Sequence, residues 1–295
     1  MSERLQKALA RAGYGSRRAL EEAITERRVS VNGAIAVLGT KITKDDEVLF
    51  NGKPVPPEKL FGNTRLVLAY HKPEGEVCTR NDPDGRPTIF DRLPKLSQGR
   101  WIAVGRLDIS TSGLILLTTD GELSNRLMHP SSGVDREYMV RVYGNVIEQQ
   151  LERLVEGVML DDGPARFTDI VRHPESDRDR INQWFYVTLM EGRNREVRRL
   201  WENQGLQVNR LKRVRYGCIF LPSFLKRGHF VELRQKEVDD LCKLVELPSL
   251  PVPKMTPQDL KDVKRRLSKK SLSRKANFAI KRPAKSPKRP SDHGR

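Results

Sequence analysis

Beyond Leu66, the pattern of apolar residues restricts the folds open to this 295-residue chain. Short apolar runs alternate with turn-rich loops, and helical stretches are scattered among them instead of following every strand. The expected strands lie at 66–70, 113–117, 138–142 and 184–189, and the expected helices at 121–128, 146–156, 193–204 and 236–245. This pattern is typical of an α+β domain with a mixed, mainly antiparallel sheet, and not of a regular βαβ repeat.

A smaller module precedes this change and begins with two helical stretches. Leu5, Ala8 and Leu9 recur at helical spacing before Gly13, which is a suitable helix end. Ser16 can cap a second helix, because its hydroxyl can accept a hydrogen bond from a free backbone N–H group. The apolar face of that helix is expected to consist of Ala19, Leu20, Ala23 and Ile24.

A hairpin is expected to complete this module. Asn32-Gly33 separates Val29-Ser30-Val31 from the apolar run 34–37. Both turn positions of such a hairpin need a positive φ, which Asn and Gly adopt most easily. The module is therefore predicted to span residues 3–50.

Proline content and charge mark the remaining boundaries. Residues 51–64 are rich in proline and are interpreted as a linker. The larger domain is expected over residues 65–247. The segment 248–295 is basic and without apolar periodicity over most of its length, which predicts a disordered tail.

Positive charge is concentrated in this tail. The formal net charge of the chain is +17. Residues 254–295 hold 15 Lys or Arg and 3 Asp or Glu, so that +12 lies there and +5 on the rest. Such a tail favours a polyanionic partner, most commonly a nucleic acid. The alternative is a solvated tail without a single partner.

Composition argues against several classes of protein. No apolar run approaches the ~18 residues of a membrane-spanning helix, and the first seven residues lack the apolar core of a signal peptide. The three cysteines, Cys78, Cys218 and Cys242, are far apart, which favours neither a disulfide framework nor a zinc site. We expect a cytoplasmic monomer with no membrane partner.

The first 50 residues carry short motifs that together are similar to one known domain. They are Arg4-Leu5-Gln6-Lys7-Ala8-Leu9-Ala10, Gly13, Ser16-Arg17-Arg18-Ala19 and Val29-Ser30-Val31-Asn32-Gly33. These motifs resemble the S4-type RNA-binding domain. Arg27 stands where that family has a glycine, so we expect a differently built turn at this position.

The start of the second helix is the expected RNA contact of this module. Free N–H groups and the helix dipole favour phosphate there, and Arg17 and Arg18 add two cations. Alternatively, both arginines are merely solvated; the surrounding motifs favour RNA contact. S4-type domains occur in several classes of RNA-binding protein, so the rest of the chain must indicate the function.

A single carboxylate lies in a loop just before the apolar strand at 113–117. The segment 104–121 reads Val-Gly-Arg-Leu-Asp-Ile-Ser-Thr-Ser-Gly-Leu-Ile-Leu-Leu-Thr-Thr-Asp-Gly, with Asp108 between two glycines. A functional side chain on a loop that a rigid strand holds is a common site design. Taken alone, Gly105-Arg106-Leu107-Asp108 is a weak motif, for which a surface ion pair between Arg106 and Asp108 is the favoured interpretation.

The full segment resembles the central motif of the pseudouridine synthases, in the branch that modifies ribosomal RNA and carries an S4-type domain. Further motifs of this branch match residues 72–75, 87–94, 137–140, 191–199 and 211–217. The segment 78–82 and the basic tail make the resemblance closest to enzymes of the large ribosomal subunit. It implies that a uridine of 23S ribosomal RNA near the peptidyl-transferase centre becomes pseudouridine, without metal or organic cofactor. The expected partner is this RNA or a large-subunit precursor particle.

The resemblance also implies roles for individual residues. Asp108 corresponds to the catalytic aspartate, and Arg198 to the arginine that pairs with it and favours its ionised form. Tyr138 corresponds to the tyrosine that stacks on the target base, and Leu211 to a residue of the pocket floor. Arg106 corresponds to a residue that fills the gap left by the extruded nucleotide. For Tyr138 and Leu211, ordinary core packing is the alternative interpretation.

Three more basic residues are expected to bind RNA: Lys72 of the motif 72–75, and Arg195 and Arg199 of the arginine motif. Arg195, Arg198 and Arg199 are spaced so that they can share one helix face. The alternative is a solvated basic face.

Two other functions compete with this hypothesis. A non-catalytic ribosome-assembly protein needs only the S4-type module and the tail, but it does not need a pocket carboxylate. Another RNA-modifying enzyme, such as a methyltransferase or nuclease, needs a glycine-rich cofactor loop after a strand or paired metal carboxylates, and neither pattern is found.

Overall fold

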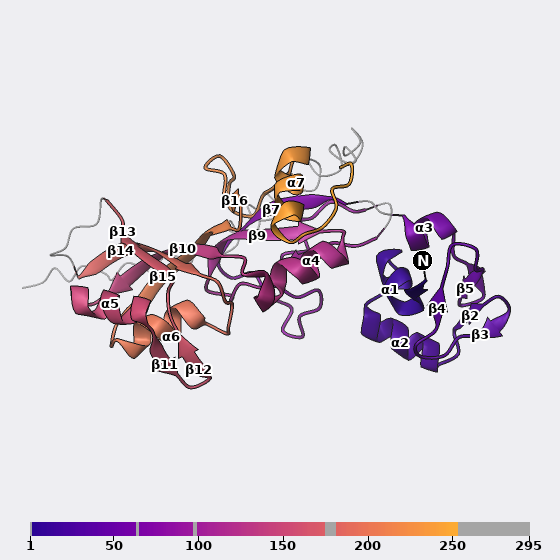
Figure 1. Ribbon diagram of the computed structural model, residues 1–295, viewed down its shortest axis with the longest axis horizontal. Helices are drawn as coiled ribbons and strands as arrows, with labels where there is room; N and C mark the ends of the chain where they lie inside the picture. The colour runs from indigo at the N-terminus through magenta and orange to yellow at the C-terminus, as the bar shows by residue number, and fades with distance from the viewer. Residues whose placement is uncertain (1, 63–64, 97–98, 175–180, 253–295) are drawn as a thin grey trace, which may run out of the picture. The chain divides into compact units, whose positions relative to one another are not determined.

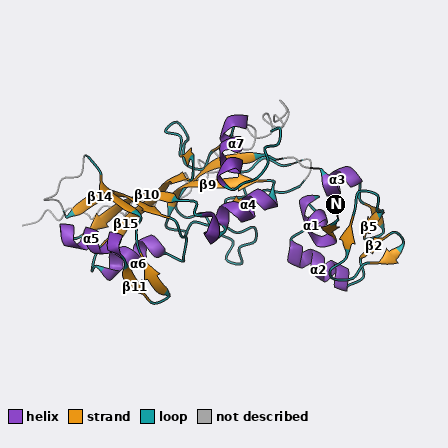
Figure 2. Cartoon of the chain, viewed as in Figure 1, coloured by secondary structure: helices purple, strands orange, loops and turns teal. Residues whose placement is uncertain are grey.

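The computed structural model describes residues 2–62, 65–96, 99–174 and 181–252 (Figures 1 and 2). Within these ranges, none of the helices combines the length and the apolar composition that crossing a membrane requires. The expected tail from residue 253 onward lies outside the described residues.

The N-terminal module has three helices and six short strands among its described residues. In chain order they are β1 (Glu3–Arg4), α1 (Leu5–Arg11), α2 (Arg17–Thr25), β2 (Val29–Val31), β3 (Ala34–Ile35), β4 (Lys41–Ile42), β5 (Val48–Phe50), β6 (Lys53–Pro54) and α3 (Pro57–Phe61). Strands β3, β2, β5 and β6 form one sheet, and β1 pairs with β4. Both helices and the hairpin that the sequence predicts are present.

The turns of this module follow the local sequence. The Ser16 hydroxyl accepts a hydrogen bond from the backbone N–H of Ala19 over 3.1 Å and so caps α2. Asn32 and Gly33 have φ values of 50° and 81°, as the hairpin turn requires. Ala19, expected on the apolar face of α2, is exposed.

Arg27 occupies a left-handed position at the end of α2. Its φ is 60°, and the next amide, of Arg28, donates to the Ala23 carbonyl over 2.9 Å. This is the conformation that glycine adopts most easily at helix ends. The turn is therefore built as it would be with glycine, contrary to our expectation, at a conformational cost of about 1 kcal/mol.

The segment expected to be a linker is largely part of the N-terminal module. Lys53–Pro54 pairs with β5, and Val55 and Leu60 are buried in the module's core, at 4% and 0% exposure. The prolines open α3 and a strand edge, which are positions that proline tolerates, so proline content alone did not indicate a linker here.

The larger part of the chain is built on a nine-stranded sheet. Its elements are β7 (Val67–Lys72), β8 (Ile102–Val104), β9 (Ser112–Thr118), α4 (Gly121–Met128), η1 (Pro130–Ser132), β10 (Arg136–Tyr143), α5 (Glu148–Glu156), β11 (Val158–Leu160), β12 (Gly163–Ala165), β13 (Asp169–Arg172), β14 (Asn182–Leu189), α6 (Glu196–Asn203), β15 (Gln207–Tyr216), β16 (Ile219–Phe220), β17 (Phe230–Glu232) and α7 (Gln235–Leu244). The strand order is β13-β14-β10-β15-β9-β7-β17, and β15 and β9 are its parallel pair. The sheet is thus mixed and mainly antiparallel, as predicted.

Helices cover opposite faces of this sheet at its two ends. Leu154 of α5 and Leu200 and Trp201 of α6 pack with β10, β14 and β15 in what we call the α5–α6 core. Residues of α4 and α7 pack on the other face of β7 and β9, in the α4–α7 core. Figure 2 shows α5 and α6 together on one side of β10, β14 and β15. In the middle of the sheet, the α5–α6 core therefore lies on one face and the α4–α7 core on the other.

The start of the expected tail is packed rather than free. The Arg65 guanidinium donates to the Pro248 carbonyl over 2.8 Å, and the Gln235 side chain bonds to Leu250 and Val252. Val252 also packs against the α4–α7 core. The apolar residues between the prolines of this segment, such as Val252, explain why it packs against the core.

Candidate active site

Asp108 lies in the loop 105–111, which joins β8 to β9. Leu107, just before it, is 7% exposed and packs in the α5–α6 core, whereas Ile109, just after it, is 41% exposed. The backbone turns back here, because the Thr111 amide donates to the Asp108 carbonyl over 3.1 Å. Asp108 is thus half-buried at the edge of the core.

Lys72, the last residue of β7, ties this loop to the sheet. Its side chain is fully buried, and Nζ donates to the carbonyls of Pro73, Asp108 and Thr111 over 3.1, 3.0 and 2.8 Å. Burial lowers the pKa of Lys72. The structure does not support the expected contact of Lys72 with RNA, because a buried ammonium group that is bonded to the loop cannot reach a ligand outside.

Arg198 braces the same loop from α6. Its Nη1 donates to the Val208 carbonyl over 2.8 Å, and its Nη2 lies 3.3 Å from both the carbonyl and the hydroxyl oxygen of Ser110. Burial and the nearby charge of Arg195 lower the pKa of Arg198, and the charge of Asp108 opposes this shift. Asp108 is therefore within electrostatic range. The expected direct ion pair is absent between these two described residues, since Arg198 uses its donors on the loop backbone and on β15.

The other arginines of this motif point elsewhere. Arg199 forms a two-pronged ion pair with Asp162 in the turn between β11 and β12, over 2.8 and 2.9 Å. Arg195 precedes α6 in a left-handed conformation, with φ 49°, and is exposed beside Glu202 at 3.8 Å. The three arginines therefore do not share one face. Asp162 already occupies Arg199, which weakens the expected RNA contact of that residue.

Tyr138 and Leu211 lie on the two strands next to the Asp108 loop. In the β10–β15 register, Tyr138 faces Arg213 and Val140 faces Leu211. Tyr138 is 9% and Leu211 4% exposed, and both belong to the α5–α6 core together with Leu107. The fold thus brings Tyr138 and Leu211 into the same packed cluster as Leu107 of the Asp108 loop.

The backbones of β9 and β15 approach each other closely where the Asp108 loop enters β9. Gly113 lies opposite Arg213 in the parallel pairing of β9 and β15, and the Arg213 Nε donates to the Leu114 carbonyl over 2.7 Å. A Cβ atom at Gly113 would lie 2.2 Å from the Arg213 carbonyl oxygen, and φ there is 112°. Glycine is therefore required for β15 to lie this close to β9.

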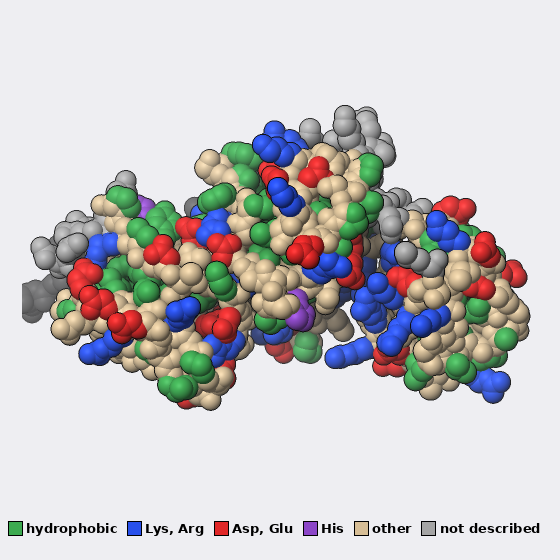
Figure 3. Space-filling view, viewed as in Figure 1, with side chains coloured by type: hydrophobic (Ala, Val, Ile, Leu, Met, Phe, Trp, Pro, Cys, Tyr) green, Lys and Arg blue, Asp and Glu red, His purple; other side chains and the backbone are tan. Residues whose placement is uncertain are grey.

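The remaining predicted residues are at the surface. Arg106 is exposed and forms no ion pair with Asp108, although the structure describes both residues. The alternative interpretation of this motif, a surface ion pair, therefore does not hold. Arg17 and Arg18 are exposed in the first turn of α2. Charged side chains of both signs are mixed over the visible face of the molecule (Figure 3).

Sequence reasoning missed the structural roles of Lys72, Gly113 and Ser110. A signal existed for Gly113 alone, because an isolated glycine within an apolar strand often marks a close backbone approach. Among the described residues, no three His, Cys, Asp or Glu side chains are grouped so as to hold a metal ion.

Comparisons with known proteins match the two folded parts of the chain. The model of the RNA pseudouridylate synthase family matches residues 66–203, and that of the S4 domain matches residues 3–48. Ribosomal large subunit pseudouridine synthase B of Vibrio cholerae is 58% identical over 248 residues, which are 84% of this chain and 76% of the relative. The chain belongs to this family of pseudouridine synthases. The enzyme of the same name from Pseudomonas aeruginosa is 57% identical over 256 residues, and the chain spans 66% of its length.

A solved structure is also similar to this pseudouridine synthase. A crystal structure of a pseudouridylate synthase aligns with a TM-score of 0.57 at 28% identity, over 81% of this chain and 99% of the other. Asp108, Tyr138 and Arg198 lie inside the region that the synthase family model matches, whereas Leu211 lies beyond it. Arg17 and Arg18 lie inside the matched S4 domain.

Proposed function

We propose that this chain converts a uridine of large-subunit ribosomal RNA to pseudouridine, with Asp108 as the catalytic carboxylate. The observation that carries the proposal is the set of hydrogen bonds that fix the backbone of the Asp108 loop. Lys72 of β7 and Arg198 of α6 both donate hydrogen bonds to its backbone, and Asp108 is half-buried. A loop held this firmly can present one carboxylate to a bound nucleotide without reorganisation.

The reaction suits such a residue. The bond from ribose C1′ to N1 of uracil breaks, the base turns over, and C1′ joins C5. The C5 proton leaves and N1 gains a proton, so the base is isomerised without redox change. A carboxylate can act as nucleophile or base in these steps and leave again unchanged. Arg198 supplies positive charge within electrostatic range of Asp108.

The neighbouring side chains suit the recognition of a flipped base. Tyr138 offers an aromatic ring on β10, near the loop, and Leu211 of β15 offers an apolar pocket floor. A uridine in a stem must leave its stack, at a cost of a few kcal/mol. Arg106, which is exposed two residues before Asp108, is proposed to enter the vacated space and offset part of this cost.

RNA recognition extends beyond the catalytic residues. Arg17 and Arg18 at the start of α2, and exposed Arg195 beside α6, are proposed phosphate contacts. The partner is 23S ribosomal RNA or a large-subunit precursor particle, at a site near the peptidyl-transferase centre. Such a partner implies a cytoplasmic enzyme, which we take to act as a monomer. No metal or organic cofactor takes part in this proposal.

The test is release of tritium from ribosomal RNA labelled at C5 of uridine. Purified protein should release the label without added cofactor. Asp108→Asn should abolish release, because it removes the charge at nearly constant size, and RNA affinity should stay within about tenfold (~1.4 kcal/mol). Asp161→Asn, an exposed carboxylate in the turn after β11, is the matched control and should release label normally.

Two results would contradict the proposal. Undiminished release by Asp108→Asn would place the catalytic group elsewhere in the chain. A complete lack of release from every ribosomal RNA preparation, naked or in precursor particles, would leave the chain a binding protein without this activity.

A further inference from the structure

The sheet presents a second face at β13, β14, β10 and β15, on the side away from Tyr138. Side chains alternate along β10 and β14, so that Val140 and Phe185 enter the α5–α6 core while Arg141 and Tyr186 point the other way. Helices α5 and α6 lie only on the Tyr138 side (Figure 1). We call the other side the open face.

Strand register places aromatic and basic residues side by side on the open face. Tyr186 faces Met139, which faces Lys212. In the next row, Trp184 faces Arg141, which in turn faces Arg210. The aromatic residues thus lie on β14, and the cations on β10 and β15.

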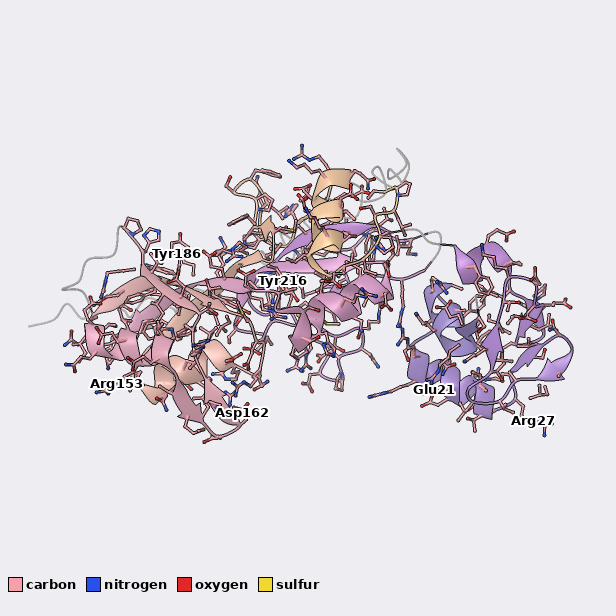
Figure 4. All side chains as sticks on the ribbon, viewed as in Figure 1. Glu21, Arg27, Arg153, Asp162, Tyr186 and Tyr216 are labelled. Atoms are coloured by element: carbon pink, nitrogen blue, oxygen red, sulfur yellow. The ribbon has the colours of Figure 1, made fainter. Side chains whose placement is uncertain are left out.

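The imidazole of His173 extends the aromatic side. It stacks on the ring of Tyr186, with centroids 5.4 Å apart and an interplanar angle of 26°. Tyr186 points away from Arg153 of α5 and from Asp162, which lie on the opposite side of the strands (Figure 4). Figure 3 shows hydrophobic side chains and a histidine along the edge of the molecule above β13 and β14. Half-buried aromatic rings are therefore grouped at this edge.

The three cations of the open face have no acidic partners. Arg141, Arg210 and Lys212 form no ion pair with any residue of the described ranges. The neighbouring row holds two carboxylates: Glu137, which is bonded to Arg215 over 2.7 Å, and Asp169, which is exposed on β13 and forms no ion pair with any of the three cations. Partial burial and the charge of Arg227 lower the pKa of Lys212, which shows that further positive charge lies nearby. The open face therefore carries three cations that form no ion pair with a carboxylate of the described residues.

This combination fits an RNA strand better than it fits a protein. Aromatic rings accept stacked bases, and unpaired guanidinium and ammonium groups accept phosphates. An apolar protein partner would leave three cations desolvated without counter-charges, and an acidic protein segment would not use the rings as stacking surfaces.

We propose that the open face is a second RNA-binding site, which holds a single-stranded segment on the side of the sheet opposite Asp108. His173, Trp184 and Tyr186 stack with bases, and Arg141, Arg210 and Lys212 bind phosphates. The site concerns affinity and not chemistry, so its loss raises KM for long RNA and leaves kcat unchanged. It extends the proposed function but stands on its own contacts, and RNA binding at the open face does not require an active Asp108.

Trp184 provides a local signal for the test. The chain has three tryptophans, and Trp101 and Trp201 are buried at 5% and 0% exposure, whereas Trp184 is half-buried. A 12-nucleotide RNA without uridine, which cannot be a substrate, should quench the fluorescence of Trp184 in the full chain. Trp184→Phe should abolish the quenching while other RNA contacts remain.

Charge variants separate the open face from general electrostatics. Changing Arg141, Arg210 and Lys212 to Gln together should weaken binding of this RNA about tenfold and lower the salt slope by about 2, because three contacts are lost at ~0.7 each. The matched control changes Arg153, Lys236 and Lys243, exposed on α5 and α7, to Gln. It removes the same charge and should alter affinity less than twofold.

Each alternative result has a definite meaning. Equal losses in the two triple variants, or binding without quenching of Trp184, would overturn the site. Binding of poly-glutamate but not of RNA to the open face would overturn it in favour of an acidic protein partner. Asp108→Asn should keep the quenching, so failure of the catalytic proposal and failure of this one are distinguishable.

Discussion

Lys72 combines an amino group with complete burial, and it contacts backbone oxygens rather than carboxylates. Four carbonyls of the Asp108 loop and its surroundings accept hydrogen bonds from this one amino group. Removal of a donor leaves buried acceptors unsatisfied, which is costlier than the net gain of an ordinary hydrogen bond. Lys72 is thus a positioning residue for Asp108.

Lys72→Met keeps the aliphatic stem and removes the donors. We expect the free energy of unfolding to fall by about 2–4 kcal/mol, and kcat to fall at least tenfold (~1.4 kcal/mol) with little change in RNA affinity. Urea unfolding and single-turnover kinetics measure these quantities. Lys53→Met, at an exposed position of β6, should change stability by less than about 0.5 kcal/mol. Lost affinity with normal kcat would instead restore the RNA-contact role.

His71 gives the stability of the protein a dependence on acid pH. Burial lowers the pKa of His71 below its usual value, although the Leu225 carbonyl, 2.7 Å from Nδ1, opposes the shift. The unfolded state therefore binds a proton more readily, so stability is full above about pH 6.5 and is lost as the pH falls through the folded-state value.

His71→Asn tests this dependence. An Asn amide can still donate to the Leu225 carbonyl but does not titrate. Unfolding free energies measured in urea from pH 7.5 to 5 should therefore fall less steeply for the variant than for the natural chain. Parallel pH profiles of the two proteins would show that His71 does not contribute.

Residue roles were predictable from sequence only where they depend on local pattern. The N-cap of Ser16 and the positive φ of Asn32 follow from neighbours in the chain. The burial of Lys72 and the two-pronged pair of Arg199 depend on segments far away, Asp108 and Asp162. No periodicity contains that information, which is why both residues were expected to bind RNA.

Element boundaries were predicted best where amphipathic periodicity is strong. The helix at 121–128 was predicted with its observed bounds, and the last helix to within one residue. α6 begins three residues later than expected, because Arg195 is left-handed. β15 was recognised as a motif but not as a strand, since its cations mask the alternation and its partners, β9 and β10, are distant.

The pairing of β15 with β9 is the contact between elements on which the site depends. Gly113→Ala places a Cβ against the Arg213 backbone and also forces a side chain into a left-handed conformation. We expect a loss of about 3–5 kcal/mol in the free energy of unfolding. At Gly205, φ is 73° and an added Cβ would meet no atom within 4 Å. Gly205→Ala therefore measures the cost of the left-handed backbone alone, which should be about 1 kcal/mol. Equal costs in urea unfolding would mean that the strands separate freely at this point.

At the scale of the whole molecule, charge divides the chain into two unequal parts. Residues 254–295 carry +12 of the total of +17, so non-specific attraction to RNA should come mainly from this segment. The proposed catalytic residues and the open face both lie within the first 252 residues. We therefore expect non-specific affinity for RNA and the proposed activity to be separable properties of this chain.

Deletion of residues 254–295 tests this division. Each lost phosphate contact lowers the slope of log K against log salt by roughly 0.7–0.9, so the truncated protein should bind ribosomal RNA with a clearly flatter salt dependence and lower affinity at low salt. Its kcat at saturating RNA should not change, since no residue of the proposed site is removed. A full-length variant with the 15 Lys and Arg of this segment changed to Gln should reproduce the deletion, because charge and not length sets the slope. An unchanged slope in either variant would show that the segment does not touch the RNA.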